Sequence, residues 1–279
     1  MNILYCGDEN IENGLIISIL SLLKNVKEVL QIYVLTMDIT TDQKQFKGIS
    51  SSKINMLDMK VKEVNQNNFV EKIDITDLFE KDLPIKNIKT RFTPYCMLRL
   101  FADEIPEIPD KILYLDTDVI CRKDCSDFYN QDISQYELVG VLDYYGKWFF
   151  RNNILKLDYI NSGVLLFNVA KIKETRLFEK CRERCKTDEM FMPDQSAINK
   201  LAMAKKIENR KYNEQRKLHS DTVFQHFTTS FRLFPWLHTL TIKPWQIDRV
   251  HNELKIREYD DIFEEYANIK KDMELIREE

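Results

Sequence analysis

The sequence predicts an α/β fold in which helices flank a mostly parallel central sheet. Apolar segments with strand character alternate along the chain with helical patterns, as they do in parallel sheets. The run ILYL at residues 112–115 is apolar without alternation, which is typical of a strand buried on both faces of such a sheet. Because no internal repeat or low-complexity linker divides the sequence, we expect one domain over residues 1–245 and a helical C-terminal appendage over residues 246–279.

The alternation begins at the N-terminus. We expect a strand at Asn2–Cys6, a helix at residues 11–23 because its apolar residues have helical spacing, and a second strand at residues 29–35. Residues 40–42 have the composition of a helix cap, so a polar helix is expected up to Gly48. Residues 53–57 are a candidate third strand.

The rest of the chain continues the same pattern. Proline is favoured in the first turn of a helix, so Thr93 and Pro94 predict the start of a helix that carries Arg99. Further strands are expected at residues 112–115, 138–142, 159–168 and 223–227, and helices at residues 172–186 and 196–204. The tail from Glu253 has helical spacing as well.

Composition narrows the class of protein. Hydrophobic residues make up 44% and charged residues 31% of the 279, an ordinary globular mixture. A formal net charge of −4 gives no general attraction to nucleic acid or to an anionic membrane, so we expect no nucleic-acid partner. The N-terminus lacks a basic leader, and no apolar stretch is long enough to span a bilayer, so we expect a cytoplasmic protein.

Glycine and cysteine usage bears on two common kinds of site. The six glycines form neither G-x-G-x-x-G nor a Walker loop, so a phosphate ester would have to be bound by another device. Two pairs of cysteines have C-x-x-x-C spacing, Cys121/Cys125 and Cys181/Cys185, and they are compatible with a shared zinc site or with buried reduced thiols. The thiol interpretation is favoured because no histidine lies beside either pair.

The strongest functional signal is the acid pair Asp116 and Asp118 in LYLDTDVI. Side chains two apart on a strand point to one face, and these two follow four apolar residues. Open α/β sheets bind ligands at the carboxyl edge of their strands. Two acids this close repel each other unless a cation neutralises them, and Mg²⁺ or Mn²⁺ would do so while leaving positions for phosphate oxygens. The alternative is a pair of surface acids in a turn.

Other residues are ambiguous when taken singly. Asp8 and Asn10 follow the first strand and fit either a helix cap or a contact to a base or ribose, the latter only if that strand lies beside the Asp116 strand. Asp194 and Gln195 precede an apolar helix and fit either an N-cap or a substrate contact. Arg99 lies in an apolar helical run and requires an acid or phosphate partner.

Seven segments in order resemble the family 8 retaining glycosyltransferases, the group of glycogenin and the bacterial lipopolysaccharide galactosyltransferases. They are YCGDEN, FTPYCMLRLF, ILYLDTDV, VGVLD, YINSGVLLFN, MPDQSAIN and HF, and they cover nearly the whole chain up to about Trp245. The resemblance implies a GT-A fold. It also implies that Asp116, Asp118 and His226 bind Mn²⁺ or Mg²⁺, although a lone histidine is more often simply a packed side chain.

The resemblance assigns the remaining site residues to a UDP-hexose donor. Asp194 and Gln195 are the candidate catalytic residues. The candidate substrate-binding residues are Asp8, Asn10, Arg99, Thr117, Asp143, Asn161, Ser162 and Lys243. Lys243 departs from the family pattern because it follows His226 by 17 residues, farther than is usual. Either the intervening segment is an insertion that returns the lysine to the site, or Arg232 replaces it at the diphosphate.

The function that the resemblance implies is retaining transfer of glucose or galactose from a UDP-sugar to a saccharide, lipid-linked or protein-linked acceptor. A sugar nucleotidyltransferase with the same acid pair, a metal-independent glycoside hydrolase and a non-catalytic nucleotide-sugar-binding partner of another transferase are the alternatives. The aromatic C-terminal region leaves homodimerisation, acceptor binding and contact with the inner face of a membrane open.

Overall fold

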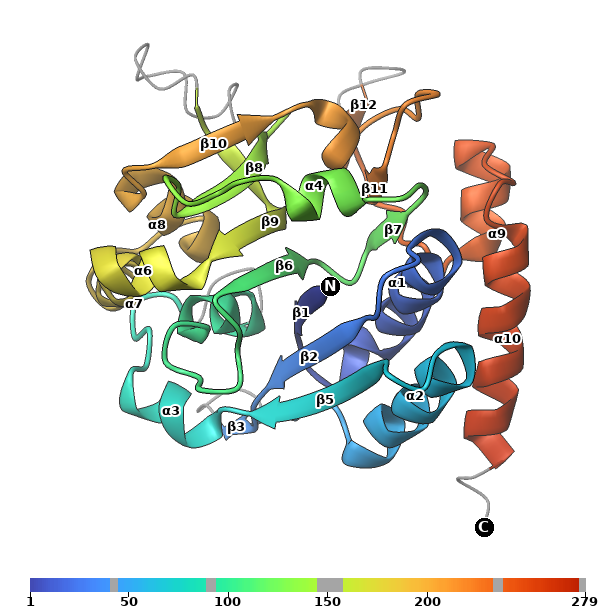
Figure 1. The fold of residues 1–279 in the computed structure, drawn as a ribbon, viewed down its shortest axis with the longest axis horizontal. Helices are drawn as coiled ribbons and strands as arrows, with labels where there is room; N and C mark the ends of the chain where they lie inside the picture. Colours follow the sequence, from blue (N-terminus) through green and yellow to red (C-terminus); the bar gives the residue numbers. More distant parts are fainter. Residues whose placement is uncertain (41–44, 89–93, 145–157, 233–237, 276–279) are drawn as a thin grey trace.

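The computed structural model describes residues 1–40, 45–88, 94–144, 158–232 and 238–275, and its centre is a seven-stranded sheet (Figure 1). The strand order is β10-β8-β9-β6-β1-β2-β5. In that order the strands span Lys205–Glu208, Leu138–Leu142, Ile160–Asn168, Lys111–Leu115, Asn2–Cys6, Gln31–Thr36 and Phe69–Asp74. β9 is antiparallel to both of its neighbours, whereas the other neighbouring pairs are parallel. The predicted mostly parallel sheet is therefore confirmed.

The central strand β6 separates two hydrophobic cores. Successive side chains of a strand point to opposite faces, so Leu113 and Leu115 enter one core while Ile112 and Tyr114 enter the other. All four side chains are buried. This is the arrangement that the unbroken apolar run ILYL predicts.

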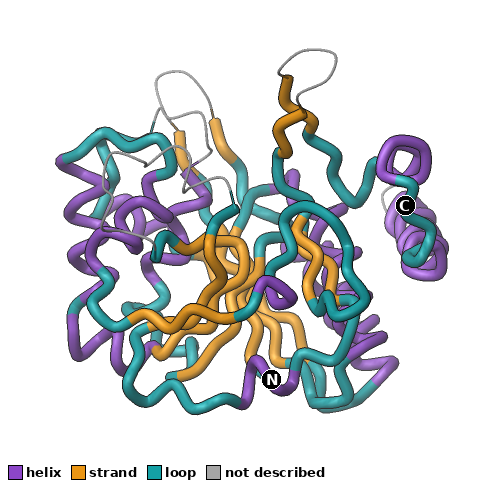
Figure 2. Tube along the Cα trace, turned by 90° about the horizontal axis from the view of Figure 1, so that it is seen from above, coloured by secondary structure: helices purple, strands orange, loops and turns teal. Residues whose placement is uncertain are grey.

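Helices cover both faces of the sheet, as Figure 2 shows with the strands running between them. The core on one face is completed by α1 (Glu12–Asn25), α2 (Ser51–Val64) and α10 (Asp260–Leu275). The core on the other face is completed by α3 (Thr76–Lys81), the 3-10 helix η2 (Pro94–Phe101), α6 (Val169–Thr175), α7 (Leu177–Thr187) and α8 (Pro193–Leu201). The sheet therefore has no face open to solvent over its centre, as the strand composition requires.

Two predictions between residues 40 and 60 are wrong. In place of a polar helix up to Gly48, the chain forms the short strands β3 (Ile39–Thr40) and β4 (Gln45–Phe46), and residues 41–44 lie outside the described part. In place of a strand at residues 53–57, the chain forms α2, because Ile54, Leu57 and Val61 have helical spacing and are buried on one face. The edge strand β5 was not predicted, since its sequence FVEKID is mostly polar.

Helix boundaries also differ from those expected. The charged helix predicted at residues 172–186 is two helices, α6 and α7, which are separated at Arg176 with a left-handed φ of 56°. The helix predicted at residues 196–204 begins earlier, at Pro193, so Met192 is its N-cap and Asp194 lies in its first turn. The helix predicted from Thr93 begins within the described residues at Pro94 and has 3-10 hydrogen bonding.

The C-terminal segment packs against the first helix. It consists of α9 (Ile247–Arg249), a π-helical turn (Val250–Leu254) and α10, which runs beside α1 in Figure 1. The buried carboxylate of Glu12 in α1 accepts hydrogen bonds from Lys53 and Lys270, and Tyr266 donates to Asn13. The helical character of this segment is confirmed, and its boundary at residue 245 stays a prediction.

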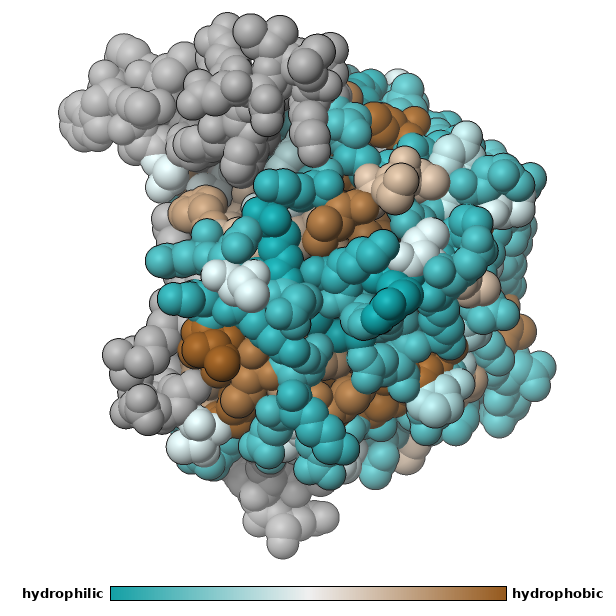
Figure 3. Space-filling view, turned by 90° about the vertical axis from the view of Figure 1, so that its left-hand side faces the viewer, coloured by the Kyte–Doolittle hydropathy of each residue, from teal (hydrophilic) through white to brown (hydrophobic). Residues whose placement is uncertain are grey.

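The surface is predominantly polar on the face that Figure 3 presents, with small apolar areas set among hydrophilic residues. Scattered apolar side chains of this kind are normal on a folded protein. Over the described residues, none of the helices combines the length and the apolar character that crossing a membrane requires. The six cysteines are free, and four of them are buried.

Candidate functional site

The candidate site lies where β1 and β6 leave the sheet. These two strands are parallel neighbours, with Ile3 opposite Leu113. Asp116 directly follows β6, and Asp8 follows β1 by two residues, so both acids emerge at the same edge. The condition under which Asp8 becomes a site candidate is therefore met. Asp8 also caps the 3-10 turn Glu9–Ile11, accepting from the backbone N–H of Asn10 at 3.0 Å and from its side chain at 2.9 Å.

Asp116, Asp118 and His226 converge although 108 residues separate the last two in sequence. Strand β11 (Phe224–His226) pairs antiparallel with β7 (Val119–Cys121), and His226 lies opposite Val119, next to Asp118. The Nε2 atom of His226 is 3.2 Å from Oδ1 of Asp118 and 3.6 Å from Oδ2 of Asp116. One ligand atom from each of the three side chains lies within 4.8 Å of the others.

Gly163 makes room for this cluster. It lies on β9, and its carbonyl accepts from the backbone N–H of Asp116 at 2.8 Å. A Cβ atom at this position would lie 2.1 Å from Cε1 of His226 and 2.9 Å from Oδ2 of Asp116. A single added methyl group would therefore collide with the cluster. Two carboxylates and one imidazole are a donor set that fits Mn²⁺ or Mg²⁺.

Arg99 and Tyr114 hold Asp116 from the side of η2. The buried guanidinium of Arg99 donates to Oδ1 of Asp116 at 3.1 Å and to the carbonyl of Ser162 at 2.6 Å, and the Tyr114 hydroxyl donates to the same carboxylate oxygen at 2.5 Å. The guanidinium lies 4.0 Å from the centre of the Tyr114 ring. Its Nε is 3.4 Å from Asp194. The expectation that Arg99 has an acid partner is thus confirmed, and the partners are Asp116 and Asp194.

Lys243 reaches the cluster from the C-terminal side. Its ammonium group contacts Oδ2 of Asp118 and donates to the Phe227 carbonyl at 3.2 Å. Burial alone would raise the pKa of Asp118, but the charge of Lys243 helps to outweigh burial and hold that pKa well below its usual range. For Lys243, burial lowers the pKa, but the charge of Asp118 outweighs burial and raises that pKa above its usual value.

The segment between His226 and Lys243 leaves the cluster and then returns to it. The intervening strands β12 (Ser230–Arg232) and β13 (His238–Leu240) form an antiparallel hairpin, after which the chain comes back to Asp118. The 17-residue interval is therefore an excursion that returns the lysine. The side chain of Arg232 lies outside the described part of the structure.

Asp143, Asn161 and Gln195 form a second cluster beside the first. Oδ2 of Asp143 accepts from Asn161 Nδ2 and from Gln195 Nε2, each at 3.0 Å. Gln195 Oε1 in turn accepts from the backbone N–H of Ser162 at 2.9 Å. These residues come from the end of β8, the start of β9 and the first turn of α8. The structure thus brings Asp143, Asn161, Ser162 and Gln195 together, and their hydrogen-bond partners orient the two amide groups.

Asp194 sits between the two clusters. It is buried in the first turn of α8, and burial raises its pKa above the usual value, while the nearby Arg99 charge works in the opposite direction. Thr117 is half-buried between Asp116 and Asp118, and its carbonyl lies against α1, 2.6 Å from where a Cβ on Gly14 would be. The backbone between the two acids is therefore fixed by close packing.

Three residues of the site were not found from the sequence: Tyr114, Gly163 and Asn213. Asn213 is buried and contacts both His226 and Asn161. Gly163 lies in the segment YINSGVLLFN, which was recognised for its neighbours only. The alternation of β6 could have identified Tyr114, because it shares a strand face with Asp116.

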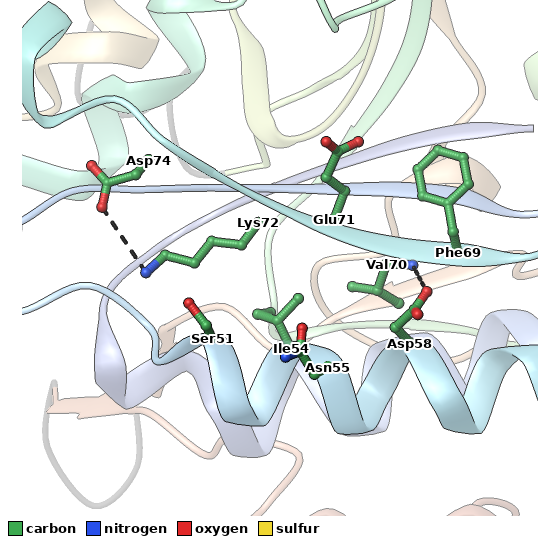
Figure 4. Close-up of a pocket in the computed structure, with 9 residues that line it drawn as sticks. All are labelled: Ser51, Ile54, Asn55, Asp58, Phe69, Val70, Glu71, Lys72 and Asp74. Carbon is green, nitrogen blue, oxygen red and sulfur yellow. Dashed lines mark hydrogen bonds and ion pairs between the residues drawn. The ribbon is translucent and has the colours of Figure 1, made fainter.

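A groove elsewhere on the molecule has a different character. It lies between α2 and the edge strand β5, has a volume of about 610 Å³ and is separated from the acid pair by β1 and β2 (Figure 4). Lys72 reaches toward Asp74 at 4.0 Å, and Asp58 accepts from the backbone N–H of Val70 at 3.0 Å. The bond from Val70 to Asp58 joins β5 to α2, whereas Lys72 and Asp74 both belong to β5, and the cluster of ligand atoms described above lies outside this groove.

The fold and the site define a GT-A glycosyltransferase. The chain belongs to glycosyltransferase family 8, whose sequence pattern matches residues 2–248. It is 24% identical over 261 residues to a lipopolysaccharide 1,3-galactosyltransferase of Salmonella typhimurium, covering 84% of this chain and 72% of that protein.

Two further comparisons bear on the extent of the likeness. A Haemophilus influenzae protein assigned to the glycosyltransferases is 26% identical over 225 residues, which is 76% of this chain. The match spans 63% of that relative, a little under two thirds of its length. The structure of the galactosyltransferase LgtC in complex with donor and acceptor sugar analogs is similar with a TM-score of 0.69 and 19% identity, covering 96% of each chain. At that identity the likeness shows a shared fold.

Proposed function

We propose that this chain transfers glucose or galactose from a UDP-sugar to a saccharide or glycoconjugate acceptor, with retention of anomeric configuration and with Mn²⁺ or Mg²⁺ as cofactor. The observation that carries the proposal is the convergence of Asp116, Asp118 and His226 at the edge where β1 and β6 end. Membership of family 8 and similarity to a lipopolysaccharide 1,3-galactosyltransferase support a hexose as the transferred group.

Asp116, Asp118 and His226 would hold the ion, and a bound divalent cation would supply positive charge for the diphosphate and for the departing UDP. Lys243 is already beside Asp118, and in our proposal its ammonium group contacts the diphosphate from the other side. Arg99 orders the diphosphate and sugar region through Asp116 and the Ser162 carbonyl. Asp8 and Asn10, at the neighbouring strand end, contact the uridine and ribose.

The hexose would lie over the second cluster. In our proposal Asp143, Asn161, Ser162 and Asp194 offer carboxylate, amide and hydroxyl groups to the sugar hydroxyls, and Thr117 lies between the metal-binding acids. Because Asp143 and Asp194 are carboxylates in largely buried positions, they also stabilise positive charge at the anomeric carbon, where water is a weak competitor. Which hydroxyls they bind decides between glucose and galactose.

In the proposed transfer step the acceptor attacks one face of the sugar. The acceptor hydroxyl approaches the anomeric carbon from the side on which UDP leaves. The bond from that carbon to the phosphate oxygen breaks with its electron pair remaining on UDP, the acceptor oxygen bonds to the carbon, and a phosphate oxygen takes the acceptor proton. Gln195 is a weak nucleophile whose amide is occupied at both ends, by Ser162 and Asp143, so we assign it a role in orienting the sugar.

The experiment is UDP release measured with UDP-glucose and UDP-galactose, with and without Mn²⁺, in the unmodified protein and in Asp116→Ala. We expect metal-dependent turnover that the substitution abolishes, while Glu179→Gln, a control at an exposed acid paired with Arg176, retains it. Turnover that persists at a normal rate in Asp116→Ala refutes the metal assignment. Activity on a glycoside that survives EDTA would instead indicate a hydrolase.

A binding measurement separates an enzyme from a nucleotide-sugar-binding partner. A ligand that binds only the folded state at 100 times its Kd stabilises it by about 2.7 kcal/mol, which for a chain of this length raises Tm by about 5 °C. A Tm shift with Mn²⁺ and UDP-sugar but no UDP release under any acceptor condition would favour the non-catalytic partner. No Tm shift with either sugar nucleotide would contradict both.

A further inference from the structure

Asn213 is buried behind the metal-ligand cluster. It directly follows the 3-10 turn Arg210–Tyr212, and the next residue, Glu214, exchanges backbone hydrogen bonds with β11. The His226 N–H donates to the Glu214 carbonyl at 3.0 Å, and the Glu214 N–H donates to the Phe224 carbonyl at 2.9 Å. This pairing fixes the Asn213 backbone beside His226, and the side chain of Asn213 is 1% exposed.

The orientation of the neighbouring Asn161 amide follows from a donor that has no ambiguity. The backbone N–H of Gly163 donates to one atom of that amide at 3.0 Å, so this atom is the oxygen Oδ1. The other atom is then Nδ2, which donates to the Asp143 carboxylate at 3.0 Å. Both ends of the Asn161 amide are therefore assigned by their partners.

The Asn213 amide is oriented in the same way. The atom of Asn213 that lies 2.9 Å from Asn161 Oδ1 must be a donor, so it is Nδ2. The atom that faces Nδ1 of His226 at 3.1 Å is consequently the carbonyl oxygen Oδ1, which can only accept. A hydrogen bond at that distance requires a proton on Nδ1 of His226.

We propose that Asn213 is a positioning residue that holds the His226 ring with its proton on Nδ1, so that the lone pair of Nε2 faces Asp116 and Asp118. The metal-binding consequence rests on the proposed function; the tautomer does not. Without Asn213, a neutral His226 ring is more stable with its proton on Nε2 than on Nδ1, because Nε2–H can donate a hydrogen bond to Asp118 Oδ1, 3.2 Å away. A ring protonated there is unable to donate its lone pair to a cation.

The same contacts connect the two clusters of the site. One continuous run of hydrogen bonds passes from His226 through Asn213 and Asn161 to Asp143 and then to Gln195. Asn213 is the member that joins the metal side to the hexose side. Partners of metal-bound histidines commonly contribute 10- to 100-fold in metal affinity, so we expect an effect on the order of 10-fold or more when the Asn213 acceptor is removed.

The tautomer is measured directly by ¹⁵N NMR of histidine-labelled, metal-free protein at a pH where the imidazole is neutral, with His226→Gln used to assign the His226 signals. The unmodified protein is expected to carry the His226 proton on Nδ1. Asn213→Leu, which has a similar volume and no acceptor, is expected to move it to Nε2. Asn213→Asp retains the acceptor toward Nδ1 but loses the donor to Asn161 Oδ1, so it is expected to keep the proton on Nδ1 while lowering stability, a combination that a purely structural role would not produce.

Asn68→Leu is the matched control, because Asn68 is also buried and bonds only backbone groups near α2, at Leu30 and Val61. It is expected to lower stability without moving the His226 proton. An unchanged Nδ1 proton in Asn213→Leu, or an Nε2 proton in the unmodified protein, overturns the proposal. If Asn213→Leu does not fold, Asn213→Ser, whose hydroxyl is too short to reach the ring, takes its place.

Mn²⁺ titration by calorimetry then tests the consequence separately. We expect Asn213→Leu to bind Mn²⁺ at least about 10-fold more weakly than Asn68→Leu, with Asn213→Asp binding at least as tightly as the unmodified protein because it adds a negative charge behind His226. Equal affinities in the two leucine variants contradict the metal-positioning role even if the tautomer changes. An unmodified protein that fails to bind Mn²⁺ while showing the expected tautomers counts against the proposed function and leaves the role of Asn213 toward His226 standing.

Discussion

Gly163→Ala offers a sharp test of the candidate metal site, because it adds one methyl group at the point where three ligands meet. The added Cβ would lie 2.1 Å from Cε1 and 2.7 Å from Nδ1 of His226, and 2.9 Å from Oδ2 of Asp116. Gly163 itself has no positive φ, so the substitution causes no backbone strain of the kind that only glycine relieves. Any effect therefore comes from the lost space.

The required displacement can be worked from these distances. Ordinary carbon contacts begin near 3.4 Å, so the His226 ring must retreat by about 1.3 Å if β9 stays in place. Metal–ligand distances tolerate about 0.2 Å. We therefore expect His226 to be lost as a ligand and Mn²⁺ affinity to fall by about 100-fold, or about 2.7 kcal/mol. Overpacking should also lower the folding stability by about 1–3 kcal/mol.

The assay is Mn²⁺ binding by calorimetry, with Tm recorded for each variant. Gly140→Ala on β8 is the matched control, because its Cβ would meet the flexible end of Leu165 at 2.8 Å, away from the metal ligands. It is expected to lower Tm and leave Mn²⁺ affinity unchanged. In the Gly163→Ala background, His226→Ala should cause little further loss of affinity, because the ligand is already displaced. Near-normal Mn²⁺ binding by Gly163→Ala would refute the placement of His226 at the ion.

Three further predictions concern charge and packing. Lys243→Met should raise KM for the UDP-sugar about 10-fold or more, because a diphosphate contact is lost. Its Mn²⁺ affinity should stay the same or rise, because no ligand is lost and the lysine no longer competes for Asp118; weaker Mn²⁺ binding with an unchanged KM would contradict this. Burial raises the pKa of Asp194 above its usual value of 3.8, so the stability that this group contributes at low pH is lost as pH rises from 3.8 through the pKa of the folded state. Asp194→Asn should therefore raise Tm at pH 7 while lowering turnover. A lower Tm at pH 7 would count against this reasoning. Phe263→Ala in α10 should cost about 3–5 kcal/mol in one thermal transition, whereas a separate early transition would mark residues 246–279 as an independent unit.

The fold was predictable from sequence where burial on both faces leaves a local signal. Strands β1, β2, β6, β8 and β9 are apolar runs and were found with small boundary errors. Strand β5 was missed because it lies at the sheet edge, where Glu71 and Lys72 face solvent or the groove. The error at α2 has a related cause: the short window at residues 53–57 contains too few turns to separate helical from strand spacing, and only Val61 completes the helical pattern.

The candidate site was predictable to the extent that its residues follow strands. Asp116 and Asp118 follow the apolar run of β6, so the rule for open sheets places them at its carboxyl edge, and Asp8 joins them on the condition that the first strand is the neighbour of β6. His226 and Lys243 were assigned by resemblance, since nothing local distinguishes them. Asn213 and the packing role of Gly163 depend on contacts between segments distant in sequence, namely β9, β11 and the turn before Glu214, and no periodicity or spacing within one segment encodes such a contact.

The charges at the site explain why a cation and a diphosphate would bind there together. Asp116, Asp118, Asp143 and Asp194 bring four carboxylates to the sheet edge, against the two cations Arg99 and Lys243. Both cations already contact carboxylates, so an incoming diphosphate meets a region whose negative charge is only partly balanced. A divalent ion held by Asp116, Asp118 and His226 would offset that excess negative charge and free Lys243 from Asp118 to face the phosphate oxygens. It follows that removing the metal should weaken UDP-sugar binding strongly. Substituting any one residue of the second cluster, Asp143, Asn161 or Gln195, should change metal affinity much less.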